Sequence, residues 1–320
     1  MSSSSIVAVV DIGSNSTKAL IAWLHEDLAL RKIAEESYGC RLFDSENLSF
    51  KSIPKCAIQK LEEVLEKLFI RCSQEKVSKV AIVATEAIRR AENKTEVIDR
   101  IEKKFGFKLK VLTGQDEAFY IAKGVQLDSS IASVKGFQAF DLGGGSLELI
   151  EYRAESEIKA KSLSLGVLSL VAEFQLEQEK ALPRDIEEEM REMLGTRLNQ
   201  AGLIEADELP LVGMGGAIVF LRKILASKKG TSFEKLSEFS ICDISALTRQ
   251  VSQMNLEERI VKFPELPLDR VDVLPVACII VEAILLNLGR KKLLHSFSNL
   301  RYGIASSWLT NPGLFQFSDK

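Results

Sequence analysis

Residues 140–150 read FDLGGGSLELI, which joins a strand-like approach, an aspartate, three consecutive glycines, a serine and a glutamate. Residues 10–20 read VDIGSNSTKAL, and the two stretches align without a gap at an offset of 141 − 11 = 130 residues, with Asp11 on Asp141. An apolar run that ends in Asp-apolar-Gly and resumes as a second apolar run predicts a β-hairpin with a tight turn. The chain therefore carries two copies of one hairpin, each expected to open a half rich in βαβ units.

Each hairpin turn has the composition of a phosphate-binding loop. Glycines let backbone N–H groups converge on an anion without a Cβ in the way, and short hydroxyls and Asn15 add donors. An aspartate at the strand end can hold a hydrated Mg²⁺ against the same phosphate oxygens. Taken singly, each turn also fits an ordinary glycine hairpin beside a stray acid. The presence of two copies favours phosphate binding.

Length and composition indicate a globular protein, long enough for two domains, without a strong basic field. The chain has 320 residues, enough for two domains with their own cores, and a net charge of −3, which does not recruit nucleic acid or anionic lipid. Five cysteines without a CxxC pair favour a reduced chain, and the N-terminus lacks the basic region of a secretory signal. We therefore expect a cytoplasmic protein that binds neither nucleic acid nor membranes, and a homodimer is left open.

Hydrophobic periodicity predicts the elements of the first half. Expected strands are residues 6–10, residues 17–23 and a run after residue 28, which form a meander, followed by strands at 80–84 and 107–112. Apolar residues from Ile58 to Phe69 fall on one helical face. A second helix is expected at 94–104, ended by Gly106, and a third begins at Gly114.

The second half repeats this order. Strands surround Asp141, a small-residue turn lies within 162–170, a charged helix starts at Pro183, and a strand at 209–212 leads into the glycine turn GMGG and a helix. Residues 227–240 are expected to be a surface loop, and residues 276–288 a buried core helix too short and too interrupted to span a membrane. The polar segment 126–136 marks the boundary, which gives domains 1–127 and 128–303, and completion of the first domain by 304–320 is left open.

Six motifs resemble those of one known family. DIGSNSTKALI, ATEAIRR, TGQDEA, DLGGGSLEL, GMGGA and NLRYG occur in the order and approximate spacing of the exopolyphosphatase and guanosine pentaphosphate phosphohydrolase family, over nearly the whole chain. The resemblance implies an α/β fold of two ribonuclease H-like (actin-like) domains that hold a polyphosphate in an interdomain cleft, as in the actin, sugar kinase and heat-shock chaperone superfamily. The length resembles that of the short family members, which lack C-terminal helical domains.

The resemblance implies that Glu117 is the catalytic glutamate. A carboxylate near a metal-bound terminal phosphate can orient and deprotonate the attacking water. Asp116 is the competing candidate, although the register from Gly114 favours Glu117. From the residues alone, either acid also fits the first turn of a helix, where the macrodipole favours negative charge.

The resemblance also implies a metal site for Mg²⁺ (or Mn²⁺). The hairpin brings Asp141 and Glu148 near each other across its turn. Asp141 would hold the metal, Glu148 would act as a second catalytic or metal-binding carboxylate, and Asp11 would face them from the other domain. The structural alternative for Glu148 is an exposed acid on a strand.

Further residues are implied to bind phosphate. Lys18 stands where the family usually has arginine, so the charge is kept but the two-pronged grip is lost. Arg89, after a buried strand, can bind phosphate oxygens bidentately. The full set is Gly13, Ser14, Asn15, Ser16, Lys18, Thr85, Arg89, Gly143, Gly144, Gly145, Ser146, Gly215, Gly216 and Arg301.

Three other positions depart from the family pattern. Ala217 replaces a usual threonine, which removes a hydroxyl donor. Asn299 replaces a glycine, and we expect it to preserve the turn because asparagine tolerates a left-handed backbone. Tyr302 replaces a glutamate, which leaves Arg301 without its expected neighbour.

These observations predict a hydrolase that releases the terminal phosphate of inorganic polyphosphate by direct attack of water. Guanosine pentaphosphate, a nucleotide of the stringent response, is left open as a further substrate. One alternative is a non-catalytic regulator that binds polyphosphate or an alarmone, which the departures from the family pattern support and the retained acids at 117, 141 and 148 oppose. A less favoured alternative is a kinase that uses ATP, because the chain shows no sugar-reading insertion.

Overall fold

The protein is described from a computed structural model, which covers residues 6–25, 29–43, 52–131, 134–154, 158–202 and 209–311. Two predictions concern residues outside these ranges. The N-terminal residues 1–5, where a secretory signal would begin, are not described, and neither are residues 312–320 of the segment 304–320 that was left open as part of the first domain. The chain forms two compact units: unit 1 comprises Met1–Ser133 and Ser298–Lys320, and unit 2 comprises Val134–Phe297. The limits expected from sequence, 127/128 and 303/304, lie within a few residues of these.

Unit 1 is built on a five-stranded mixed sheet in the order β3-β2-β1-β4-β5. The strands are β1 (Ile6–Ile12), β2 (Ser16–Leu24), β3 (Leu30–Gly39), β4 (Lys79–Ala84) and β5 (Leu109–Val111). The first three form the predicted antiparallel meander, and β4 and β5 continue the sheet parallel to β1. The middle strands β1 and β4 are nearly continuous apolar runs because both of their faces are covered.

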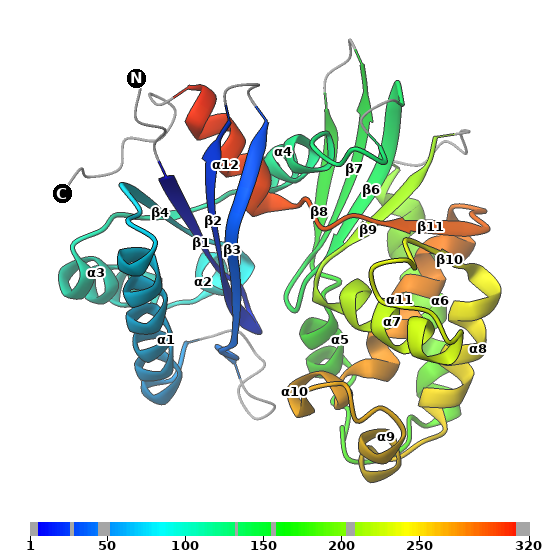
Figure 1. Cartoon of the computed structure of the whole chain (residues 1–320). Coiled ribbons are helices and arrows are strands. Elements are labelled where there is room, and N and C mark those ends of the chain that lie inside the picture. Colours follow the sequence, from blue (N-terminus) through cyan, green and yellow to red (C-terminus); the bar gives the residue numbers. More distant parts are fainter. Residues whose placement is uncertain are drawn as a thin grey trace. The chain divides into compact units, whose positions relative to one another are not determined.

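Helices cover both faces of this sheet (Figure 1). The helices of unit 1 are α1 (Lys55–Gln74), α2 (Glu86–Arg90), α3 (Lys94–Phe105), α4 (Gly114–Val125) and α12 (Leu300–Thr310). Figure 1 shows α1 and α3 on one face, and buried Glu62 of α1 joins them through Arg100 and Lys104 of α3. As predicted, α3 ends at Gly106, whose φ of 74° suits glycine.

Helices α4 and α12 cross at unusually short range. A Cβ at Gly303 would overlap the carbonyl oxygen of Tyr120, and one at Gly124 would overlap the carbonyl oxygen of Asn299. Only glycine permits this approach of two backbones. The crossing attaches the C-terminal helix of the chain to the helix that carries Glu117.

Unit 2 repeats the topology of unit 1. Its sheet has the order β10-β11-β9-β6-β7-β8. The strands are β6 (Gly136–Leu142), β7 (Leu147–Arg153), β8 (Lys159–Leu163), β9 (Leu211–Met214), β10 (Glu238–Ser240) and β11 (Lys292–His295). Read from β8, a three-stranded meander is followed by two strands parallel to β6, as in unit 1, and β10 adds an antiparallel edge. The predicted fold class of two related α/β domains is confirmed.

The helices of unit 2 include one apolar helix against which several others pack. They are α5 (Val167–Glu173), α6 (Arg184–Ala201), α7 (Gly216–Lys228), α8 (Ile241–Ser252), α9 (Leu256–Lys262), α10 (Leu268–Val271) and α11 (Leu274–Asn287). Helix α11, the predicted core helix, contacts α5, α6, α7 and α8 and is buried along most of its length. Within the described ranges, no helix combines the length and the apolar character that crossing a membrane requires.

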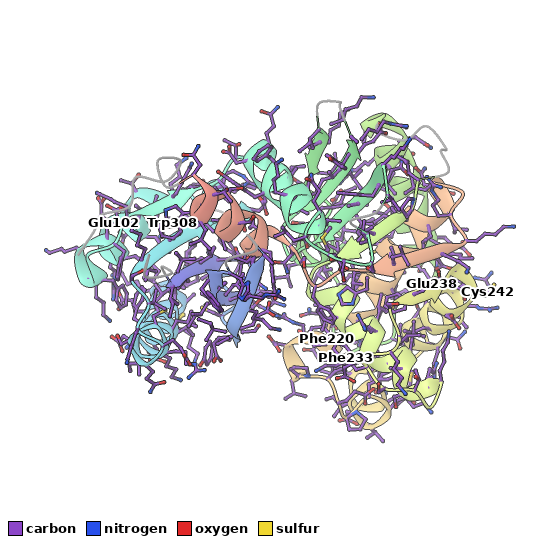
Figure 2. All side chains as sticks on the ribbon, turned by 45° about the horizontal axis from the view of Figure 1, so that its top comes forward. Glu102, Phe220, Phe233, Glu238, Cys242 and Trp308 are labelled. Carbon is purple, nitrogen blue, oxygen red and sulfur yellow. The ribbon has the colours of Figure 1, made fainter. Side chains whose placement is uncertain are left out.

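The segment 227–240 is in large part the expected surface loop. Residues 229–237 lie outside helices and strands and are mostly exposed, whereas 227–228 end α7 and 238–240 form β10. Phe233, labelled with Phe220 in Figure 2, packs against the buried guanidinium of Arg222, 4.9 Å from its ring centre. The prediction was wrong only at the two ends, because Lys, Gly and Ser indicate a surface position and gave no sign that Phe239 would be buried in β10.

Candidate active site

Three strand ends meet at one edge of the sheet in unit 1. Ile12 of β1 pairs with Ala84 of β4, and Ala84 pairs with Val111 of β5. Thr85 N donates to Ile12 O at 3.3 Å, and Leu112 N donates to Ala84 O at 2.9 Å. The hairpin turn, α2 and α4 therefore all begin at the carboxyl edge of the sheet, where open α/β sheets bind ligands.

The two predicted hairpins are confirmed and share one register. In unit 1, Gly13 N donates to Ser16 O at 3.1 Å, and Asp11 pairs with Lys18. In unit 2, the residues 130 positions later repeat both features: Gly143 N donates to Ser146 O at 3.0 Å, and Asp141 pairs with Glu148. In each turn, four residues thus lie between the two residues of the last pair, Ile12–Thr17 in unit 1 and Leu142–Leu147 in unit 2.

The turn of unit 1 is held by the chain that leaves β3. Cys40 N donates to Asn15 O at 3.1 Å, and Leu42 N donates to Ser14 O at 3.0 Å. Arg41 Nε donates to Asn15 Oδ1 at 3.0 Å. These bonds satisfy carbonyl oxygens that would otherwise repel a bound anion. Arg41 is a cation beside the turn that the sequence reading missed, because no motif marked it.

The turn of unit 2 is held in a comparable way by α5. Val167 N donates to Gly143 O at 3.1 Å, and Leu168 N donates to Gly144 O at 2.7 Å. Ser169 Oγ donates to Gly145 O at 2.7 Å. A Cβ at Gly166 would overlap the backbone of this turn, so the close fit requires glycine there. The small residues within 162–170 thus let this segment pack against the glycine turn at 143–145 and hydrogen-bond to its carbonyl oxygens.

Arg301 lies beside Asp11 and has a partner that the sequence did not reveal. Its Nη2 lies 2.6 Å from Glu35 Oε1, and its Nη1 lies 3.7 Å from Asp11 Oδ2. Glu35, on β3, therefore supplies the carboxylate that the Tyr302 substitution removed from the neighbouring position. Burial and then the charge of Glu35 raise the pKa of Tyr302 to about 12, so this phenol stays neutral at physiological pH.

The expected left-handed turn at Asn299 is wrong. Its φ of −126° is extended, and its side chain accepts a hydrogen bond from Arg301 N at 3.3 Å. Asn299 is therefore the N-cap of α12, a position that asparagine also favours. The cap fixes the first turn of α12, which carries Arg301.

Asp11 has a free acceptor of the kind that a metal ion uses. Its Oδ1 is buried without a hydrogen-bond partner. Burial raises the pKa of Asp11, and the charges of Arg301 and Lys18 oppose this rise. A buried carboxylate oxygen without a partner calls for an explanation, and a bound Mg²⁺ or its water supplies one.

Other carboxylates fit a sparse metal site. Across the described ranges, no three His, Cys, Asp or Glu side chains gather into a group that could hold a metal ion. Mg²⁺ keeps several waters and is usually held by one or two carboxylates together with substrate phosphates. Asp11 in unit 1 and the Asp141–Glu148 pair in unit 2 fit that pattern, each in its own unit.

Glu117 and Asp116 have separate roles in α4. Asp116 forms a capping box: its Oδ2 accepts from Thr113 N at 3.2 Å, and its N donates to Thr113 Oγ1 at 3.1 Å. Glu117 is 6% exposed, and its Oε2 lies 3.1 Å from Arg89 Nη1. The cap occupies Asp116, so Glu117 is the better placed of the two candidates.

Arg89 joins two buried acids. It donates to Leu112 O at 2.7 Å and to Glu117, and its Nη2 also bonds Glu86. Burial alone would lower the pKa of Arg89, but Glu117 and then Glu86 outweigh burial and raise it. The sequence reading missed Glu86, although its position three residues before Arg89 in a helix is a known pairing distance.

In unit 2, the acids lie against the second glycine turn. A Cβ at Gly215, whose φ is +97°, would lie 2.7 Å from Asp141 Oδ1. Glu148 is 2% exposed, and its Oε1 accepts from Ser162 Oγ at 2.8 Å. The alternative of an exposed strand acid at Glu148 is therefore wrong. The structure gathers the predicted residues in two groups, one in each unit.

Comparison with known proteins finds sequence relatives that match about half of the chain and solved structures that match nearly all of it. Exopolyphosphatase 1 of Mycobacterium bovis is 28% identical over 168 residues, which are 52% of this chain and 48% of the relative. Guanosine-5'-triphosphate,3'-diphosphate pyrophosphatase of Pseudoalteromonas translucida is 30% identical over 174 residues, 53% of this chain and 33% of the relative. The chain thus spans about half or less of the length of the curated relatives it matches.

The solved structure of the Aquifex aeolicus member of the Ppx/GppA family has the same fold. The superposition covers 96% of this chain and 98% of the Aquifex aeolicus chain, with 24% sequence identity and a TM-score of 0.79. The family model that matches is that of the Ppx/GppA phosphatase family, and it covers residues 7–312. On that match, and with the duplicated hairpins and buried acids in place, the chain belongs to the Ppx/GppA phosphatase family.

Proposed function

We propose that the chain is a phosphohydrolase that releases the terminal phosphate of linear polyphosphate by direct attack of water, with guanosine pentaphosphate as a further candidate substrate. The observation that carries the proposal is the buried Glu117 carboxylate, fixed by Arg89 at the sheet edge that also carries the Gly13–Ser16 turn. The names of the relatives, an exopolyphosphatase and a guanosine polyphosphate pyrophosphatase, support this substrate class.

The glycine turns would bind the anionic chain. In each turn, the neighbouring chain satisfies carbonyl oxygens, through 40–42 in unit 1 and through α5 in unit 2. Backbone N–H groups and the Ser14 and Ser16 hydroxyls are the donors suited to phosphate oxygens. Lys18 adds a positive charge beside Asp11 on the paired strand.

Glu117 would act as the general base. The oxygen of a water molecule attacks the terminal phosphorus, its proton passes to the Glu117 carboxylate, and the bond from phosphorus to the bridging oxygen breaks. The shortened chain leaves as a phosphate anion, so no covalent enzyme intermediate is required. Asp11 in unit 1, or Asp141 and Glu148 in unit 2, would hold Mg²⁺ or Mn²⁺, which would neutralise charge on the reacting phosphate when bound.

A non-catalytic polyphosphate or alarmone sensor is the second candidate. It is supported by the departures at Ala217 and Tyr302 and by the engagement of Arg89 and Arg301 with protein carboxylates. A sensor would bind the polyanion without turnover.

Phosphate release from long-chain polyphosphate, tripolyphosphate and guanosine pentaphosphate, each with Mg²⁺ or EDTA, separates the two candidates. We expect metal-dependent release from at least one of them, which also identifies the substrate. Binding without release from any of the three would overturn the hydrolase and support the sensor.

A further inference from the structure

Glu86 is a buried acid that the proposed mechanism does not use. It is the first residue of α2 and is 6% exposed. Its carboxylate bonds Arg89 Nη2 and lies 3.4 Å from Arg90 Nη1. An ionised carboxylate is rarely buried unless it has such partners.

The contacts of Glu86 decide what Arg89 can offer to a phosphate. Arg89 Nη1 donates to Leu112 O and to Glu117, and Nη2 donates to Glu86. Both terminal nitrogens are thus engaged by protein acceptors, although Arg89 is the cation expected to grip the substrate. A phosphate oxygen that reaches Nη2 must displace or share the Glu86 carboxylate.

A carboxylate and a phosphate compete for a guanidinium on similar terms. Both present a pair of anionic oxygens that match its fork of N–H donors. Glu86 can therefore stand in for a phosphate when no substrate is bound. The competitor is permanently attached to the chain, only three residues from Arg89 on the same helix, so its local concentration is high.

We propose that Glu86 is an internal competitor that occupies Arg89 in the substrate-free chain and so lowers the affinity of the site for phosphate groups. The identity of the ligand rests on the proposed function. A polyphosphate has further phosphates that the glycine turn and Lys18 can hold, so it overcomes the competition. A single inorganic phosphate lacks these contacts, and Glu86 thereby promotes release of the product.

Equilibrium binding tests this directly without turnover. Inorganic phosphate with Mg²⁺ and tripolyphosphate with EDTA are titrated into the native chain and into Glu86→Gln, which removes the charge and keeps the shape. We expect the variant to bind inorganic phosphate about fivefold more tightly, since one like charge is lost beside the anion in partly screened surroundings, and tripolyphosphate by a comparable factor, because both ligands must displace the same carboxylate from Arg89. In turnover, product inhibition by phosphate should strengthen in parallel.

The matched control is Glu92→Gln, which makes the same charge change on an exposed residue two positions beyond α2. We expect its phosphate affinity to equal that of the native chain. An equal gain in both variants would show an effect of net charge alone and overturn the proposal, as would unchanged or weaker phosphate binding by Glu86→Gln.

A second variant guards against misfolding. Glu86→Asp keeps the negative charge on a side chain that is one methylene shorter, which weakens its contact with Arg89. We therefore expect a gain in phosphate affinity that is smaller than that of Glu86→Gln. The absence of any gain would contradict the proposal. Failure here is distinct from failure of the proposed function. Binding without hydrolysis by the native chain would overturn the hydrolase only, whereas equal affinities of the native chain and Glu86→Gln would overturn only the role of Glu86.

Discussion

At the scale of single residues, the presence or absence of hydrogen-bond partners separates the acids that bond only within the protein from Asp11, which is suited to a ligand. Asp116 closes a capping box, and Glu62 joins two helices, so both are explained by structure. The buried Oδ1 of Asp11 has no hydrogen-bond partner, and burial raises the pKa of this carboxyl. A buried carboxylate whose pKa is perturbed in this way is typical of functional sites.

Asp11→Asn is expected to preserve or raise stability while it lowers activity. The folded-state pKa of Asp11 is raised, so ionisation destabilises the fold once the pH exceeds the ordinary value of 3.8. Asparagine removes that cost, and Arg301 keeps its closer partner Glu35 at 2.6 Å. The melting temperature of the variant relative to the native chain should therefore rise as the pH increases above 3.8. A variant that is less stable by more than about 1 kcal/mol at pH 7 would contradict this account.

Gly215→Ala tests the fit between the second glycine turn and Asp141. At a φ of +97°, alanine is strained, and its Cβ would lie 2.7 Å from Asp141 Oδ1. We expect a loss of about 3 kcal/mol in stability, by thermal or urea unfolding, together with loss of activity. Gly216→Ala is the control, because the nearest atom to its Cβ, on Phe220, is 3.8 Å away. Equal effects of the two substitutions would refute the argument.

The sequence could predict the contacts of the site residues only where they depend on neighbouring residues in the chain. The hairpin acids and turns follow from adjacent residues, and the register that joins Asp141 to Glu148 was confirmed. The Glu35–Arg301 pair joins residues 266 positions apart, so no local pattern signalled it. The backbone at Asn299 was predicted wrongly because asparagine suits both a left-handed turn and an N-cap.

At the scale of elements, the crossing of α4 and α12 connects two parts of the candidate site. Helix α4 carries Glu117, and α12 carries Arg301 beside Asp11. The glycines at 124 and 303 bring the two backbones into contact. The sequence predicted the helix that begins at Gly114, but it predicted neither α12 nor the contact, because residues 299–303 were interpreted as a turn and a glycine within a helix does not reveal which element approaches it.

Gly303→Ala should separate these helices. The added Cβ would overlap the Tyr120 carbonyl oxygen, a backbone atom that cannot move by a rotamer change. We expect destabilisation of about 3 kcal/mol and reduced activity. Gly195→Ala on α6 is the matched control, since no atom lies within 4 Å of its Cβ, and it should stabilise the protein by roughly 0.5–1 kcal/mol. A neutral effect at Gly303 would contradict the described crossing.

At the scale of the whole molecule, one topology is used twice. In each unit, the aspartate-bearing hairpin supplies two strands of a three-stranded meander, and two parallel strands extend the sheet from the strand that carries the aspartate. The internal repeat at a fixed offset made this duplication predictable from sequence. The return of the chain to unit 1 at Ser298 depends on long-range packing of α12, which local patterns describe less well.

The most direct test of the central claim compares the polyphosphatase turnover of Glu117→Gln with that of Asp116→Asn. Both substitutions remove one negative charge from the first turn of α4, but only Glu117 would accept the proton of the attacking water. We expect kcat to fall by about 10²–10⁴-fold in Glu117→Gln and to stay within about twofold of the native value in Asp116→Asn, with at most a small loss of stability from the weakened cap. Full turnover by Glu117→Gln, or an equal loss in both variants, would contradict the assignment of Glu117 as the base.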